Sequence, residues 1–83
     1  MMHAIADFTK AIEIHPQYAY AYSNRGVVYG KLAEYVRAIA DFSKAIEINP
    51  QDAFYYESRG RFYEKLDQPE KAEADCQKAD GNK

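Results

Sequence analysis

Residues 38–51 read AIADFSKAIEINPQ, and residues 4–17 read AIADFTKAIEIHPQ. The two stretches differ at two positions, the pairs Thr9/Ser43 and His15/Asn49. The offset from Pro16 to Pro50 is 34 residues. A second set has the same offset: Tyr22, Arg25, Gly26, Tyr29, Lys31 and Leu32 recur as Tyr56, Arg59, Gly60, Tyr63, Lys65 and Leu66. Two matches at one fixed offset indicate an internal structural repeat.

Prolines and apolar spacing predict helices between the repeat boundaries. Pro16, Pro50 and Pro69 interrupt helical runs or start them. Apolar residues recur at helical spacing, and no stretch shows the sustained alternation or hairpin turns of strands. We expect helices over about residues 3–14, 18–31, 35–48, 52–65 and 69–80. Because the joints between them are short, neighbouring helices must pack antiparallel.

The repeat resembles the tetratricopeptide family, whose 34-residue period carries the spacing W-x2-LG-x2-Y…A-x3-F…P. Here that spacing holds Tyr22, Arg25, Gly26, Tyr29, Ala38, Phe42 and Pro50, and again Tyr56, Arg59, Gly60, Tyr63, Ala72 and Cys76. The chain departs from the pattern by Tyr for Trp, Arg for Leu and Cys76 for Phe. The resemblance implies an all-α fold, a right-handed superhelical stack of antiparallel helix pairs with five helices.

The same resemblance implies one repeat domain over residues 1–83. We expect the second helix of a partial repeat at 3–17, a full repeat at 19–52 and a last repeat at 53–83. Gly26 and Gly60 would lie in the middle of helices, where glycine is unfavourable by about 1 kcal/mol relative to alanine. Close approach of a partner helix would explain both glycines.

Composition limits the partners and the location of the protein. The net charge is −2, without a basic stripe, so we expect neither nucleic acid nor a membrane as a partner. The start of the chain lacks the pattern of a signal peptide. Cys76 is the single cysteine, so an internal disulfide is impossible, which slightly favours a cytoplasmic location.

No constellation in the sequence supports catalysis, and we expect no enzyme activity, no metal and no cofactor. His3 and His15 lack the paired spacing of metal ligands. Cys76 has no evident activating partner and is expected to occupy a core position, as Phe42 does in the preceding repeat. A glycine-rich phosphate loop is absent from the sequence.

The family resemblance implies a concave groove lined by the first helix of each pair, at 18–31 and 52–65. A protein or peptide partner would bind there. The faces of these helices away from the Gly/Tyr packing stripe would carry the contacts: Tyr20, Ser23, Asn24, Val27, Lys31, Phe54, Glu57, Ser58, Arg61 and Lys65. Amphipathic aromatic and polar residues of this kind are common in recognition surfaces.

Five charged residues are expected at one height of the stack. Residues equally distant from a joint lie level across a helix pair, and the joints are centred near residues 16, 33, 50 and 67. Charges of alternating sign then share a level on all five helices: Asp7, Arg25, Asp41, Arg59 and Asp75. We interpret them as a charge ladder, partly buried, that sets register between repeats more than it adds stability.

The two ends of the stack are expected to differ. The first helix lacks the helix that would precede it in a pair, so Ile5, Phe8 and Ile12 keep uncovered apolar surface. We expect self-association through this helix, or local fraying of it. The last helix has polar residues on its outer side and is expected to act as a solvating cap.

Two alternatives to groove binding remain from the sequence alone. The repeats could be a structural module that mediates oligomerisation without a groove ligand. A helical-repeat RNA binder of the pentatricopeptide kind is the other alternative, but it usually has a period near 35 and a basic face. The fixed 34-residue offset and the acidic balance argue against RNA binding.

Overall fold

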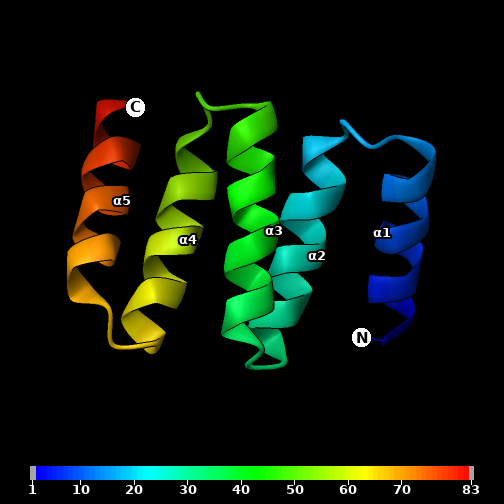
Figure 1. Cartoon of the computed structure of the whole chain (residues 1–83), viewed down its shortest axis with the longest axis horizontal. Coiled ribbons are helices and arrows are strands. Elements are labelled where there is room, and N and C mark those ends of the chain that lie inside the picture. The colour runs from blue at the N-terminus through cyan, green and yellow to red at the C-terminus, as the bar shows by residue number, and fades with distance from the viewer. Residues whose placement is uncertain (1, 83) are drawn as a thin grey trace.

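Over residues 2–82, which the computed structural model describes, the chain forms five helices and no strand. The helices are α1 (Met2–Ile14), α2 (Ala19–Lys31), α3 (Tyr35–Ile48), α4 (Ala53–Lys65) and α5 (Pro69–Gly81). They stand side by side in chain order, each antiparallel to the next (Figure 1). The prediction of an all-α stack of five helices is confirmed, and every predicted boundary agrees to within one residue.

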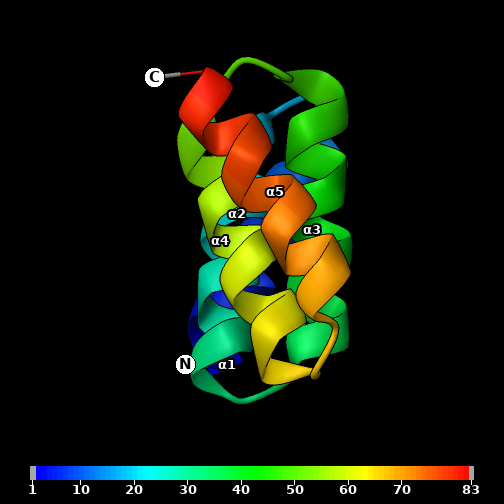
Figure 2. The same cartoon turned by 90° about the vertical axis from the view of Figure 1, so that its left-hand side faces the viewer.

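The helices divide into two types that alternate along the chain. Figure 2 shows α2 and α4, which we call first-type helices, on one side and α3 and α5 on the other. We call α1, α3 and α5 second-type helices. The pairs α2–α3 and α4–α5 share the most extensive interfaces, while α1 packs on α2. The stack measures 33 × 25 × 14 Å.

Two equivalent turns close the helix pairs with the same geometry. Ala33 after α2 and Asp67 after α4 have φ of 60° and 57°, in the left-handed region. The amide of the next residue donates to the carbonyl oxygen of Tyr29 at 2.9 Å in the first turn, and to that of Tyr63 at 2.9 Å in the second. This is the Schellman arrangement, which satisfies carbonyl groups at the end of a helix.

The core is centred on Phe42, which is fully buried on α3. Its ring centroid lies 5.8 Å from that of Phe62 and 6.4 Å from that of Tyr55, both on α4. On the other side, a Cβ added to Gly26 would lie 2.9 Å from the Phe42 ring. The expectation that this mid-helix glycine permits close approach of the partner helix is therefore confirmed, because any side chain there would displace a core ring.

Gly60 repeats this arrangement with smaller neighbours. A Cβ at Gly60 would lie 3.2 Å from the carbonyl oxygen of Ala72 and 3.6 Å from Sγ of Cys76. The expectation that Cys76 fills a core position was wrong, because its side chain is exposed. Phe42 is buried because α3 packs between α2 and α4. α5 packs on α4, and no described helix covers its other side.

Candidate functional site

A hollow of about 340 Å³ lies between the two first-type helices and is the candidate binding groove. α2 contributes one wall and α4 the other. The residues that line it are Val27, Gly30, Lys31, Phe54, Ser58, Arg61 and Phe62. Since α2 and α4 run parallel to each other, corresponding turns of the two helices face the same groove.

Aromatic packing gives the groove a rigid apolar floor. A Cβ at Gly30 would lie 2.4 Å from Cζ of Phe62, so only glycine leaves room for that ring at its present place. The Phe62 ring stacks on the ring of Tyr35, with centroids 5.8 Å apart. Phe54 packs edge-on against Phe42 at 6.2 Å and still exposes 51% of its surface. An exposed ring with a fixed position is a suitable anchor for a partner.

The charged residues that line the groove are cationic. Lys31 belongs to the last turn of α2, and Arg61 projects from α4. Glu57 lies outside this lining and contributes instead to a neighbouring hollow of about 390 Å³ with Glu64 and Arg61. The groove therefore combines apolar rings with positive charge, while the acidic side chains lie on its α5 side.

Five of the ten groove residues expected from the sequence line the hollow: Val27, Lys31, Phe54, Ser58 and Arg61. Tyr20 and Lys65 are exposed beyond it, with Tyr20 at 61%, and Asn24 is half-buried. Gly30 and Phe62 were missed. The spacing could have found Phe62, because it follows Phe54 and Ser58 at helical intervals on one face of α4.

The assignment of Ser23 to the groove surface was wrong, because this residue is buried with 3% exposure. Ser23 precedes Gly26 by three residues, and residues three apart share a face of a helix. Both therefore lie on the buried side of α2, where Gly26 meets α3.

Two arginines connect the second-type helices across the first-type helices. Arg25 donates from Nε and Nη2 to the two carboxylate oxygens of Asp41, at 2.9 and 2.7 Å. Its Nη1 donates to Oγ1 of Thr9 on α1 at 3.1 Å. Arg59 repeats the pattern with Asp75, at 2.8 and 2.7 Å, and with Oγ of Ser43 at 3.1 Å. Each arginine thus bonds to both of its second-type neighbours, through a bidentate ion pair on one side.

The charge ladder therefore differs from the expected one at two steps. Among residues 2–82, Arg25 forms no ion pair with Asp7, and Arg59 forms none with Asp41. The hydroxyl groups of Thr9 and Ser43 take those places. Equal distance from a joint determines the height of a residue in the stack, but it does not determine which side of the helix carries its side chain. The side chains that face the arginines are the hydroxyls of Thr9 and Ser43.

Each arginine is enclosed by two tyrosine rings of its own helix. The guanidinium carbon of Arg25 lies 5.8 Å from the ring centroid of Tyr22 and 5.9 Å from that of Tyr29. Hydrogen bonding to Asp41 raises the pKa of the Arg25 guanidinium above its usual value, against the opposing effect of burial. Arg59 has the same surroundings in Tyr56 and Tyr63, and its bonds to Asp75 raise its pKa likewise.

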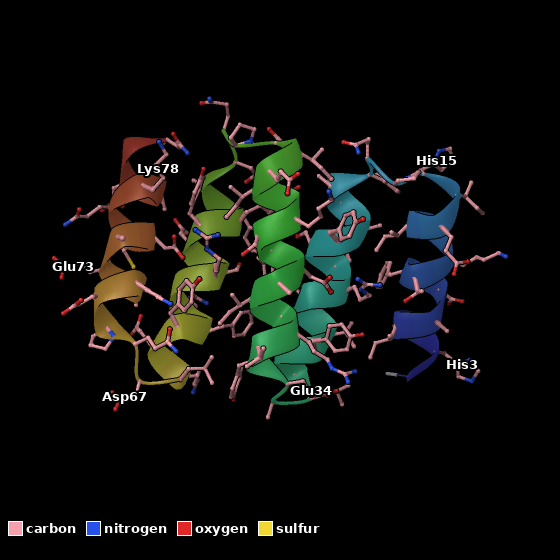
Figure 3. The ribbon with its side chains drawn as sticks, in the orientation of Figure 1. His3, His15, Glu34, Asp67, Glu73 and Lys78 are labelled. Carbon is pink, nitrogen blue, oxygen red and sulfur yellow. The ribbon has the colours of Figure 1, made fainter. Side chains whose placement is uncertain are left out.

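The apolar residues expected to mediate self-association, Ile5, Phe8 and Ile12, are half-buried on α1. Ile14 at the end of the same helix is 61% exposed. His3 lies in the first turn of α1, His15 directly follows the end of that helix, and both point outward (Figure 3). Over the described residues, no group of three or more His, Cys, Asp or Glu side chains could hold a metal ion. Within residues 2–82, no helix has the length and apolar character needed to cross a membrane.

The fold and the groove define a helical repeat protein of the protein-interaction class. Family models described as "Tetratricopeptide repeat" match residues 19–52 and 42–74, and a model described as "TPR repeat" matches residues 3–32. The chain belongs to the tetratricopeptide repeat family. No curated protein sequence matches it significantly.

Solved structures of MamA have the same fold. Two crystal structures of MamA are each 32% identical to this chain and cover 94% of it, with TM-scores of 0.92 and 0.90. A structure of a MamA mutant is 22% identical and covers 92% of the chain, with a TM-score of 0.88, which shows a shared fold alone. The chain spans 46% and 43% of the first two MamA chains, less than half of their length.

Proposed function

We propose that this chain is a non-catalytic scaffold that binds a protein or peptide partner in the groove between α2 and α4. The observation that carries the proposal is the hollow itself, whose walls come from both first-type helices. Its floor is apolar and held in place by ring packing, while Phe54 remains half-exposed. Tetratricopeptide repeats act through protein partners, and the likeness to MamA supports a scaffold of the same fold.

The groove chemistry favours an extended segment that carries an apolar side chain next to a carboxylate. Phe54 and Val27 offer apolar contact, and Lys31 and Arg61 offer positive charge. Opposite charges across an interface steer association and disfavour the wrong partners. A segment that carries Lys or Arg at the same place would meet like charge, so selectivity follows from sign as well as from shape.

The test selects peptides from a displayed random library against the whole chain and measures affinities by fluorescence anisotropy. We expect selected peptides to pair an apolar residue with Asp or Glu. Phe54→Ala should weaken their binding about tenfold, which is typical for a central aromatic anchor. Arg61→Glu should weaken it similarly and reverse the charge preference.

Val36→Ala is the matched control, because Val36 is an apolar residue of α3 that is 70% exposed outside the groove. It should leave peptide affinity unchanged. If selected peptides bind the Phe54→Ala and Arg61→Glu variants as tightly as the unaltered chain, the groove is not the binding site.

Self-assembly through α1 is a second candidate function, favoured by the incomplete burial of Ile5, Phe8 and Ile12. It predicts a mass in sedimentation equilibrium that rises with concentration. Ile5→Lys should abolish that rise, because a charge on this surface would be desolvated in a dimer. A constant monomer mass for the unaltered chain contradicts self-assembly and leaves groove binding untouched.

A further inference from the structure

Tyr55 of α4 directly follows the groove residue Phe54 and combines a buried ring with a hydroxyl that has no partner. The residue is 6% exposed. Its ring packs against Phe42, with centroids 6.4 Å apart, and against Phe54, with centroids 6.3 Å apart. Among residues 2–82, no group forms a hydrogen bond with the Tyr55 hydroxyl. Buried tyrosines usually do satisfy their hydroxyl groups, so this exception requires an explanation.

Tyr56, the next residue of α4, shows the usual arrangement. It is also 6% exposed, and its hydroxyl donates to the carbonyl oxygen of Pro50 at 3.0 Å. Over the described residues, no fully buried side-chain oxygen or nitrogen atom lacks a hydrogen-bond partner. The Tyr55 hydroxyl has no partner and must therefore reach the surface. Tyr55 thus holds a polar group at the surface in a position that core packing fixes.

The preceding repeat shows that helix packing does not call for a hydroxyl at this place. The equivalent position 34 residues earlier holds Ala21, which is buried. The Tyr55 ring belongs to a core cluster with Phe42 and Ala45 of α3, and Ala19 at the start of α2 packs against the same cluster. The ring therefore lies where the first turns of α2 and α4 meet α3.

Two oxygen-bearing side chains lie near the Tyr55 hydroxyl. Burial raises the pKa of this hydroxyl above its usual value, and the Asp52 carboxylate and the Tyr20 hydroxyl raise it further. The proton is therefore retained at neutral pH. Asp52 caps α4 by accepting from the amide of Phe54 at 2.9 Å, and Tyr20 in the first turn of α2 is 61% exposed. The hydroxyl thus lies just beyond the hollow, at the N-terminal end of the groove.

The surroundings of the hydroxyl select the group that it can bind. A phenol that keeps its proton donates to an oxygen acceptor. The negative charge of Asp52 opposes a second carboxylate at this place, so a neutral carbonyl suits it better. Phe54 is the next residue, and each residue of a segment that contacts its ring carries a main-chain carbonyl beside its side chain.

We propose that the Tyr55 hydroxyl is a specificity-determining group of the groove, where it donates to a main-chain carbonyl oxygen of the bound segment beside the side chain that contacts Phe54. This inference rests on the proposed function and adds main-chain recognition to it. The carboxylate of the segment would lie away from Asp52, toward Lys31 and Arg61. An extended segment is favoured over a helix, because a helix uses its carbonyl groups internally.

The test uses a peptide selected from the displayed library and measures its affinity for the whole chain by fluorescence anisotropy. Tyr55→Phe keeps the ring and removes the hydroxyl, so we expect affinity to fall about three- to tenfold, as for the loss of one neutral hydrogen bond. The melting temperature should not change, because the hydroxyl has no partner within the chain.

A series of thioamide peptides locates the acceptor. In each peptide, sulfur replaces one main-chain carbonyl oxygen and gives a weaker acceptor. At one position, beside the apolar residue, the replacement should weaken binding to the unaltered chain and have no effect on binding to Tyr55→Phe. Such coupling between one carbonyl and one hydroxyl identifies a direct contact.

Tyr56→Phe is the matched control, because it removes a hydroxyl from an equally buried ring on the same helix. It should lower the melting temperature through loss of the bond to Pro50 and leave peptide affinity unchanged. If Tyr55→Phe instead lowers the melting temperature as Tyr56→Phe does and leaves affinity unchanged, its hydroxyl serves folding and the inference is overturned.

The remaining outcomes separate this inference from the proposed function. Binding that Phe54→Ala weakens and Tyr55→Phe does not would overturn the role of the hydroxyl and leave the groove as the binding site. A thioamide series without a position that couples to Tyr55 overturns it in the same way. A library without binders, or binders that Phe54→Ala and Arg61→Glu do not weaken, overturns both.

Discussion

Arg25 and Arg59 stand where the family pattern has leucine, and their surroundings explain how a charge is accommodated there. Each guanidinium has a bidentate carboxylate, a hydroxyl and two tyrosine rings as neighbours. An arginine suits this place better than lysine because its planar fork matches a carboxylate and stacks on aromatic faces. The substitution replaces apolar packing with directional bonds that connect three helices.

The two mid-helix glycines should differ in how much an added methyl group destabilises the fold. Gly26→Ala should destabilise the fold by about 1 kcal/mol net. Overpacking against Phe42 costs about 1–3 kcal/mol, and it exceeds the gain of about 1 kcal/mol in helix propensity. Gly60→Ala should be milder, since its nearest contacts are 3.2 and 3.3 Å away and include no ring. Urea unfolding followed by circular dichroism measures both free energies of unfolding.

Gly81→Ala serves as the control for these variants, because a Cβ there would meet nothing within 4 Å. It should leave the free energy of unfolding unchanged or raise it. Equal effects of Gly26→Ala and Gly60→Ala would show that contact with Phe42 does not decide the outcome.

Spacing along one helix predicted which residues share a face of that helix, but it did not predict which side chains face each other across neighbouring helices. Phe54 and Arg61 lie seven residues apart on one face of α4, and both line the hollow between α2 and α4. Thr9 and Ser43 were missed as partners of the arginines, because equal height across a joint leaves the facing side undetermined. The sequence did contain a signal for these partners, because a hydroxyl residue follows each aspartate by two positions, Thr9 after Asp7 and Ser43 after Asp41.

At the scale of an element, α1 and α3 can be compared directly, because their sequences are nearly identical while their neighbouring helices differ. α3 packs between α2 and α4, whereas α1 packs on α2. Phe42 is fully buried and Phe8 is half-buried. Local propensity is nearly equal in the two helices, so differences between them come from tertiary contacts.

Hydrogen exchange should separate the two helices. We expect backbone amides of α1 to exchange faster than those of α3 at equivalent positions, such as Ile12 and Ile46, because opening α1 breaks fewer buried contacts. Intrinsic exchange rates are closely matched by the near-identical sequences, which supplies the control within one molecule. Equal protection of the two helices would contradict this expectation.

The sequence also predicted the elements themselves, because proline positions and the period set every helix to within one residue. The environment of the outermost helices was harder to predict. Cys76 aligns with Phe42, yet it is exposed because no described helix follows on that side. Alignment to a repeat gives a residue its equivalent position, but only the neighbours of the helix determine whether that position is buried.

At the scale of the whole molecule, stability should grow with the number of repeats. Duplicating residues 19–52 in place adds a helix pair with its own arginine bridge and one more interface between pairs. We expect a higher urea midpoint and a steeper dependence on urea, since more surface is buried. Equilibrium unfolding measures both, and an inserted copy that carries Phe42→Asp is the control.

The inserted copy that carries Phe42→Asp should not raise the urea midpoint. Asp in the place of Phe42 would bury a charge beside Gly26 and Phe62. A duplicated chain that is no more stable than the original would show that neighbouring pairs do not stabilise each other. The Schellman turns at Ala33 and Asp67 already show that equivalent segments adopt one geometry in both pairs.

The outward side of α5 has a consequence for how arrays of this kind can lengthen. Glu73 points away from the stack (Figure 3), and Asp80 is exposed on the same helix. Adding another layer there would strip water from carboxylates, while α1 at the opposite edge offers alanine and phenylalanine. Lengthening an array at such an edge is opposed by the desolvation of charged groups, so arrays of this kind lengthen more readily where the outward residues are uncharged.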